Sequence, residues 1–281
     1  MTSTDPQQDE RVDRSDQRVA IVTGAASGIG QGIAQHLAQT GMAVAMLDLD
    51  DSVMRAAEEQ TRDGHTALGF RVDVSDADSV RGTFERVAAE LGRPWLVVNS
   101  AGVYASGPTS ELQSEDWDRV MAVDLRGVFL CSQAALRFMT PDGGGRIVVI
   151  SSIAGHVARP NQIAYCAAKA GVEHFVRCLA IEVAGDGITV NAIAPGMTRS
   201  HMLDAVIDRI GSEADLLALI PTGRFAVPGD HAALVEWLAS DAAGHVTGQV
   251  IDIDGGQSLY LPLTTGTDRA QAPQEKGTST S

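Results

Sequence analysis

The sequence predicts an α/β fold, built around a doubly wound seven-stranded parallel sheet with helices on both faces. From residue 18 onward, short β-branched runs alternate with longer segments of helical periodicity, as they do when helical crossovers join parallel strands. Several runs are almost continuously apolar, which is typical of strands covered on both faces. The expected strands are residues 18–23, 42–48, 66–71, 95–99, 146–151, 189–194 and 249–253.

The segments between these strands carry apolar residues at helical spacing. The expected helices are residues 29–39, 53–62, 79–90, 115–139, 164–183 and 231–239. One long connection, residues 197–227, interrupts the alternation, with helical patterns in 203–210 and 213–219. Because long connections in compact domains usually form lids or binding loops, we expect a substrate lid here.

Length and composition favour a single folded domain. The chain has 281 residues, of which 44% are hydrophobic, enough for one sizeable core over residues 18–263. Residues 1–17 and 264–281 are polar and have little to bury, so we expect flexible tails. The three cysteines and seven histidines show no spacing typical of a disulfide framework or a metal site.

The charge balance points to a small-molecule partner. A formal net charge of -15 argues against nucleic acid and against an anionic membrane surface, because both require a basic patch. No apolar run is long enough to span a bilayer, and the first 17 residues lack an apolar core such as a signal peptide has. We therefore expect a cytoplasmic protein without a membrane partner.

A glycine-rich turn, Thr23 to Gly30, follows the first expected strand and opens the first helix. Glycines at this place let the backbone approach a pyrophosphate, which the amides and the helix N-terminus would hold. The turn therefore predicts a Rossmann-like dinucleotide site, although glycines also make ordinary strand-to-helix turns. The expected contacts are Gly24, Ser27, Gly28, Ile29 and Gly30.

Asp48 ends the second expected strand and favours NAD over NADP. A carboxylate at this place accepts hydrogen bonds from ribose hydroxyls and repels a 2′-phosphate. Ser27 and Leu49 are neutral where an NADP site would carry a cation. The alternative is a solvated carboxylate that helps to start the next helix, a role better suited to Asp50 and Asp51.

Tyr165 and Lys169 are four residues apart on an expected helix, so their side chains emerge from one face. A phenol ordinarily titrates near 10, so a neighbouring cation is needed for it to act as a base near neutral pH. The alternative is a packed aromatic beside a solvated cation. The chain has only two lysines, however, and the other is Lys276 in the C-terminal tail. This scarcity argues against a chance occurrence of a lysine four residues after a tyrosine.

Ser152 ends an expected strand, where the carboxyl ends of the strands face the ligand cleft. Its hydroxyl would orient the substrate oxygen and stabilise its developing charge. Tyr165 would accept the proton of an alcohol during oxidation and return it to a carbonyl during reduction. The residues therefore predict hydride transfer between a secondary alcohol or ketone and a nicotinamide.

Taken in order, these motifs resemble the short-chain dehydrogenase/reductase family, in its compact single-domain branch, over residues 18 to about 258. The matching landmarks are the TGxxxGxG turn at Thr23, Asp48, Asp73-Val74, Asn99 with Ala101-Gly102, Ser152, the YxxxK motif at Tyr165, Asn191, Pro195-Gly196 and Asp254-Gly255-Gly256. Ser100 stands where the family usually has a second asparagine.

The resemblance implies roles for further residues. Asp73 and Val74 would contact adenine, Asn99 and Gly102 would line the cofactor cleft, and Tyr165 and Lys169 would also touch the cofactor. Around the nicotinamide it implies the positions Pro195, Gly196, Thr198 and Ser200. It also implies a homotetramer built on the helices 115–139 and 164–183 and on the edge 249–256.

Asp124 joins the implied catalytic group but departs from the family. The family usually carries asparagine there, which helps to hold a helix irregularity and a proton-relay water. Aspartate keeps the size and the acceptor but loses the amide donor, so the relay is the step most affected by this departure.

The substrate side is expected from residues 103–106, 153–162 and 197–220, which are mixed in character but supply several apolar side chains. No arginine cluster there offers a clear anchor for a phosphate or carboxylate, and Arg159 and Arg199 are the exceptions that could hold an anion. The sequence therefore favours a neutral, moderately hydrophobic small molecule. Two alternatives stay open. One is an NADPH-dependent ketoacyl or carbonyl reductase, against which Asp48 argues, and the other is a nucleotide-sensing protein without catalysis.

Overall fold

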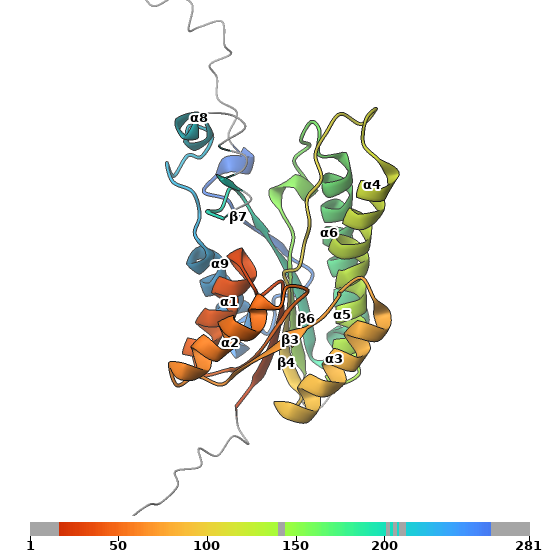
Figure 1. Ribbon diagram of the computed structural model, residues 1–281, viewed down its shortest axis with the longest axis vertical. Coiled ribbons are helices and arrows are strands. Elements are labelled where there is room, and N and C mark those ends of the chain that lie inside the picture. Colours follow the sequence, from red (N-terminus) through yellow and green to blue (C-terminus); the bar gives the residue numbers. More distant parts are fainter. Residues whose placement is uncertain (1–16, 140–143, 201–202, 205–206, 208–211, 260–281) are drawn as a thin grey trace, which may run out of the picture.

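One sheet of seven parallel strands organises the chain, and its strand order is β3-β2-β1-β4-β5-β6-β7 (Figure 1). The computed structural model describes residues 17–139, 144–200, 203–204, 207 and 212–259. The strands are β1 (Val19–Thr23), β2 (Ala43–Asp48), β3 (Ala67–Arg71), β4 (Pro94–Asn99), β5 (Gly145–Ile150), β6 (Ile188–Pro195) and β7 (Val250–Ile253). The predicted Rossmann-like doubly wound fold is confirmed, and each strand bound lies within one residue of its expected position.

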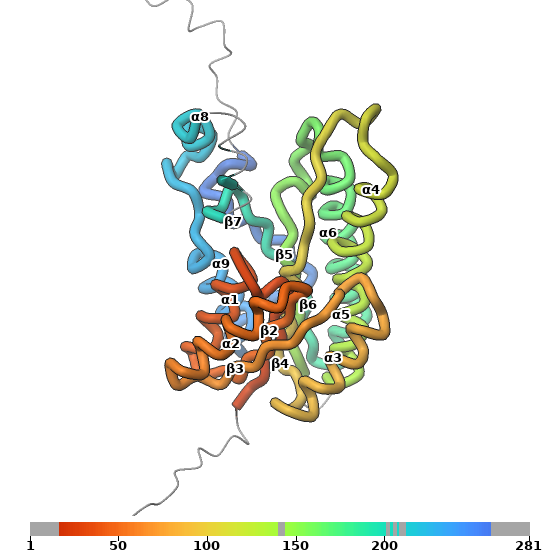
Figure 2. Tube along the Cα trace, viewed as in Figure 1, coloured from red at the N-terminus to blue at the C-terminus, as the bar shows by residue number. Residues whose placement is uncertain are grey.

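Helices cover both faces of the sheet, as Figure 2 shows along the chain trace. One layer contains α1 (Gly28–Gln39), α2 (Ser52–Arg62) and α9 (Pro228–Ala239). The other contains α3 (Ala77–Glu90), α4 (Ser114–Val120), α5 (Gly127–Leu136) and α6 (Ile163–Val183). Since strand side chains alternate between faces, each layer packs on its own set of apolar residues.

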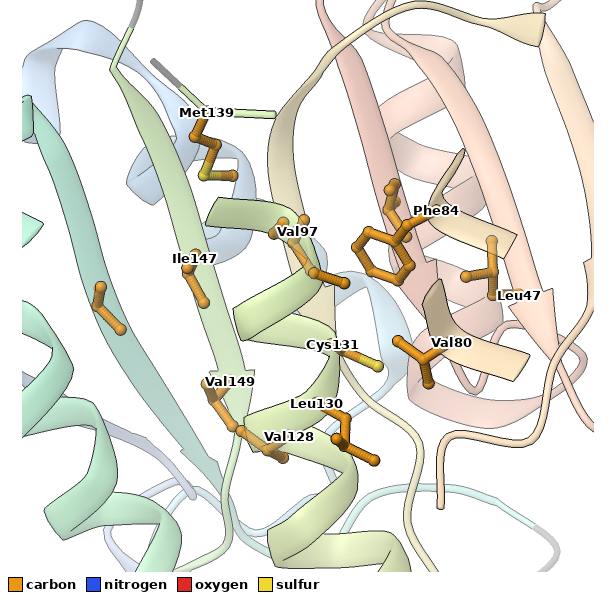
Figure 3. Packing of buried hydrophobic residues seen from close by; sticks show 14 of the residues in the cluster. Leu47, Val80, Phe84, Val97, Val128, Leu130, Cys131, Met139, Ile147 and Val149 are labelled. Atoms are coloured by element: carbon orange, nitrogen blue, oxygen red, sulfur yellow. The ribbon is translucent and has the colours of Figure 1, made fainter. Parts of the chain in front are cut away.

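The alternation is visible in β1. Val19 and Ile21 belong to the core under α3, α5 and α6, whereas Ala20 and Val22 belong to the core under α1, α2 and α9. Figure 3 shows the first core, in which Phe84 and Cys131 are almost fully buried. Truncating a buried phenylalanine such as Phe84 to alanine costs about 3–5 kcal/mol. These two cores hold the carboxyl ends of the strands in fixed positions.

The helix expected over residues 115–139 is not regular, and in this respect the expectation is wrong. A π-helical segment, Met121–Arg126, joins α4 to α5, and α5 ends at Leu136. The helix irregularity that the family resemblance implied is therefore confirmed. A π-helical turn holds more residues than an α-helical one, and it places the side chain of Asp124 in the protein interior.

The connection after β6 folds back on itself. Its helix α8 (Glu213–Leu217) confirms part of the helix predicted at 213–219. Most of the helix predicted at 203–210 lies outside the described residues, and so do nearly all residues of the two expected tails. Leu203, Leu216, Ile220 and Phe225 form a small core within this connection. Among the described residues, no helix is long and apolar enough to cross a membrane.

Candidate active site

The strand order reverses between β1 and β4, and the carboxyl ends of these two strands border a cleft. Thr23 fixes this junction, because its Oγ1 accepts hydrogen bonds from the amides of Ser100 (3.0 Å) and Ala101 (3.1 Å). The cleft has a volume of about 950 Å³, within the range of small-molecule sites. Ligands of doubly wound sheets bind at this reversal.

The glycine turn forms one wall of the cleft. A Cβ on Gly24 would lie 2.8 Å from the backbone of Ala101, and one on Gly30 would collide with the carbonyl oxygen of Gly24. Gly28 has φ 58°, and a Cβ there would meet no other atom within 4 Å. The turn is closely packed at Gly24 and Gly30 and open at Gly28. It therefore fits a pyrophosphate that approaches its backbone amides.

The carboxylate of Asp48, at the end of β2, is hydrogen-bonded to the glycine turn. Its Oδ2 accepts from the amide of Ala26 (2.9 Å) and its Oδ1 from the amide of Asp50 (3.0 Å). Both oxygens keep a lone pair for a ribose hydroxyl. Asp50, one residue before the N-cap of α2, accepts a hydrogen bond from the amide of Ser52, and that hydrogen bond lowers the pKa of Asp50.

One cation lies closer to Asp48 than the sequence suggests. Strand register pairs Asp48 with Arg71 of β3, and the Arg71 Nε donates to the carbonyl of Leu49 and lies 3.4 Å from Asp51 Oδ1. The sequence pattern at Ser27 and Leu49 did not reveal this cation. Arg71 does not line the cleft, and Asp51 partly neutralises it.

Most other residues expected at the cofactor line this same cleft. They are Ser27, Ile29, Asp73, Val74, Gly102, Pro195, Gly196, Thr198 and Ser200. Asn99 differs, because its buried side chain donates to Ser132 Oγ (3.2 Å) and faces α5, away from the cleft lining. The hydroxyl of Thr198 is 2.9 Å from Nε2 of His231, a buried histidine that sequence reasoning missed.

Tyr165, Lys169 and Ser152 also line this cleft, so the structure brings the expected catalytic group together with the glycine turn. The ammonium of Lys169 is 5.4 Å from the centre of the Tyr165 ring and donates to the carbonyl of Ile150 (3.1 Å). Tyr104 packs edge-on against Tyr165, with 5.5 Å between the ring centres. Ser152 Oγ accepts from the amide of Ala154 (3.2 Å), which leaves its own proton for a ligand.

Asp124 and Lys169 form a buried ion pair. Oδ2 of Asp124 lies 3.2 Å from Nζ of Lys169, and Oδ1 accepts from the amide of Val103 (2.8 Å). Burial alone would lower the pKa of Lys169, but the negative charge of Asp124, with help from Tyr165, raises it above its usual value. The lysine therefore stays an ammonium, with a carboxylate in direct contact.

A second polar group, one turn further along α6, supports the strand end that carries Ser152. Glu173 is buried, and its Oε1 accepts from Ser151 Oγ (3.2 Å) and lies 2.9 Å from Nδ1 of His156. Burial opposes the charged form of His156, but Glu173 and Asp252 outweigh it and raise the pKa of this histidine. Sequence reasoning missed this group, although Glu173 lies four residues after Lys169 and hence on the same helix face.

The described residues contain no group of three or more histidine, cysteine or acidic side chains that could hold a metal ion. All three cysteines are free thiols, and burial raises the pKa of Cys131 to about 12, which keeps that thiol protonated and unreactive.

A cleft with a phosphate-binding turn at one end and a tyrosine beside a lysine at the other is typical of dinucleotide-dependent oxidoreductases. Residues 24–258 match the family model of enoyl-(acyl carrier protein) reductases. The chain belongs to the short-chain dehydrogenase/reductase family, whose members are oxidoreductases that bind a nicotinamide cofactor.

Three relatives illustrate the range of the family. The chain is 44% identical to D-threitol dehydrogenase of Mycolicibacterium smegmatis, over 88% of this chain and 95% of that one. It is 42% identical to cis-4-hydroxycyclohexanecarboxylate dehydrogenase of Sinomonas cyclohexanicum, over 85% and 96%. A solved structure of actinorhodin polyketide ketoreductase with NADPH superposes with TM-score 0.84 at 33% identity, covering 87% of this chain and 98% of that one.

Proposed function

We propose that the protein interconverts a secondary alcohol and a ketone with NAD(H), and that Tyr165 is its acid and base. The observation that carries the proposal is the position of Tyr165, which lines one cleft together with Ser152, Lys169 and the glycine turn. The two curated relatives described above are dehydrogenases of alcohols, which supports the same type of substrate.

A bound nicotinamide would accept or supply the hydride. Ser152 Oγ donates to the substrate oxygen and holds it at the Tyr165 hydroxyl, and this hydrogen bond strengthens as negative charge develops on that oxygen. Tyr165 takes the alcohol proton during oxidation and gives it back during reduction. The ammonium of Lys169 favours the phenolate form of Tyr165.

Asp48 supports NAD as the cofactor. Its carboxylate is held by two backbone amides at the end of β2, where it would accept from both ribose hydroxyls and repel a 2′-phosphate. A nucleotide-sensing role explains Asp48 and the glycine turn, but it gives no reason for a lysine ammonium buried beside Tyr165 and Ser152.

The test is a panel of secondary alcohols that includes D-threitol and cis-4-hydroxycyclohexanecarboxylate, each assayed with NAD⁺ and with NADP⁺. We expect reduced cofactor to form with NAD⁺ and much more slowly with NADP⁺. Turnover with NADP⁺ alone would instead assign the protein to the NADPH-dependent reductases. Tight NADH binding without turnover on any alcohol or ketone would favour a nucleotide sensor.

We further propose that the protein is cytoplasmic and assembles as a homotetramer. Helices α5 and α6 expose apolar side chains, of which Phe129 is 44% and Ile181 83% accessible in the isolated chain. Burying such side chains between copies of the chain is a common route to symmetric assembly. Light scattering coupled to size exclusion measures the assembly, and a monomer at micromolar concentration would contradict it.

A further inference from the structure

Three cationic side chains line the cleft, and two of them have carboxylate partners. Lys169 lies 3.2 Å from Asp124, and the guanidinium of Arg199 pairs with Glu213. Arg159 is the third. Throughout the part of the chain that the structure describes, no carboxylate lies within 4 Å of it and no hydrogen bond engages its guanidinium. A partly buried guanidinium with five free donors is suited to an anion that reaches it from the cleft.

In the sequence, Arg159 lies between Ser152 and Tyr165, the two residues that would hold the substrate oxygen. It lies seven positions after Ser152 and six before Tyr165, in the loop that enters α6. Backbone hydrogen bonds hold the loop on both sides of Arg159. Before it, the amide of Val157 donates to Ile153 O (2.8 Å), and after it, Asn161 O accepts from the amide of Gly107 (2.9 Å). Pro160 further restricts the backbone of the residue before it.

The cleft that Arg159 lines also has apolar side chains. Val103, Tyr104, Met197 and Leu203 line the same cleft. Some apolar side chains of the expected lid pack against the protein and not only toward a ligand. Leu203 belongs to the small core with Leu216 and Ile220, and Met197 and Ile207 pack against this core. A ligand of this site would therefore present a compact apolar body together with one anionic group.

We propose that Arg159 binds a carboxylate of the substrate, so that the protein acts on hydroxy or keto acids with a compact apolar body. The inference rests on the proposed function and refines it, since the sequence alone favours a neutral substrate. The chain carries a net charge of -15, so a substrate anion needs a local cation to overcome the repulsion of the protein. A single guanidinium matches a carboxylate in both geometry and charge.

A binding experiment tests the proposal without depending on turnover. Calorimetry compares cyclohexanecarboxylate with cyclohexanecarboxamide on the NADH-saturated protein, since the two probes share a body and differ in charge. We expect the carboxylate to bind at least about tenfold more tightly, and Arg159→Gln to abolish that difference while leaving amide binding unchanged. Arg159→Lys, which keeps the charge but loses the planar fork, should retain part of the difference.

Arg93→Gln is the matched control. Arg93 is exposed and lies just before the amino end of β4, whereas the cleft lies at the carboxyl ends of the strands. Its removal changes the net charge by the same amount. It should leave both affinities unchanged. Equal binding of the two probes by the wild type, or a carboxylate preference that survives in Arg159→Gln, would overturn the role of Arg159.

Turnover provides the second measurement and separates this inference from the proposed function. In the NAD⁺ assay, kcat/KM for cis-4-hydroxycyclohexanecarboxylate relative to its carboxamide should fall about 10- to 100-fold in Arg159→Gln, mainly through KM. Oxidation of both compounds with an unchanged ratio would contradict the role of Arg159 and leave the proposed function intact. Selective, Arg159-dependent binding of the carboxylate without oxidation or reduction of any substrate would support the anion site and contradict the proposed function.

Discussion

Asp124 Oδ2 lies 3.2 Å from Lys169 Nζ, and both side chains are almost fully buried. Asparagine, the residue that the family usually carries here, would leave the ammonium uncompensated. Gly102 makes room for the pair, because a Cβ there would come within 3.1 Å of Asp124 Oδ2. We therefore propose that Asp124 acts on the reaction through Lys169, as a positioning residue that sets how much positive charge reaches Tyr165.

Asp124→Asn should shift the pH dependence of alcohol oxidation. With Lys169 still protonated, removal of the neighbouring negative charge favours the phenolate of Tyr165. We expect the acid-side midpoint of kcat/KM to move to lower pH by about one unit, since neutralising one buried charge at this range commonly shifts a titration by that amount. The pH–rate profiles of the two proteins, measured with the same alcohol, give the shift.

Asp124→Ala is the matched comparison for this effect. It also removes the negative charge, but it leaves the amide of Val103 without its acceptor. We expect it to lower both kcat and the midpoint of thermal unfolding, because a buried unpaired amide costs about 1–3 kcal/mol. An Asp124→Asn profile that overlays the wild type would show that the carboxylate charge does not reach Tyr165.

Asp48→Ala should narrow the preference for NAD⁺ over NADP⁺ by about tenfold or more in kcat/KM, because it removes the ribose acceptor and the repulsion of a 2′-phosphate. Arg71 would then be the nearest cation for that phosphate, since it adjoins Leu49 and Asp51.

Adding Arg71→Gln to Asp48→Ala should lower the NADP⁺ activity again, while Arg71→Gln alone should leave NAD⁺ kinetics close to those of the wild type. An unchanged cofactor ratio in Asp48→Ala would mean that Asp48 does not read the ribose.

His231 should make the protein sensitive to acid. Burial lowers the pKa of His231 to about 4, from 6.5 when exposed. Between pH 6.5 and pH 4, His231 is therefore protonated in the unfolded chain but neutral in the folded chain. The stability present above pH 6.5 falls as the pH drops towards 4, by up to roughly 3 kcal/mol.

Urea unfolding of the wild type and of His231→Gln, each at pH 7 and pH 5, isolates this contribution from that of the carboxylates. The wild type should lose more of its free energy of unfolding between the two pH values than the variant. Equal losses would indicate that the pKa of His231 is the same in the folded and the unfolded protein, and would contradict the prediction.

The sequence predicted the strands well because each is an apolar run set off from helical segments, and the parallel sheet buries both faces of these runs. It also predicted that Ser152, Tyr165 and Lys169 share a cleft, since strand ends and one helix face fix their positions. Contacts between distant elements could not be predicted in the same way. The register that places Arg71 beside Leu49, the inward turn of Asn99 and the hydrogen bond of Thr198 with His231 all depend on packing between segments far apart in the chain.

The central claim is that Tyr165 transfers the proton, and Tyr165→Phe tests it most directly. The measurement is kcat for NADH formation from NAD⁺ and the best alcohol of the panel, together with the Kd of NADH from its fluorescence. The account predicts a loss of kcat of about 10³-fold or more, with the Kd of NADH within about threefold of the wild type. A variant that keeps kcat within about tenfold of the wild type would contradict the claim and require another proton carrier.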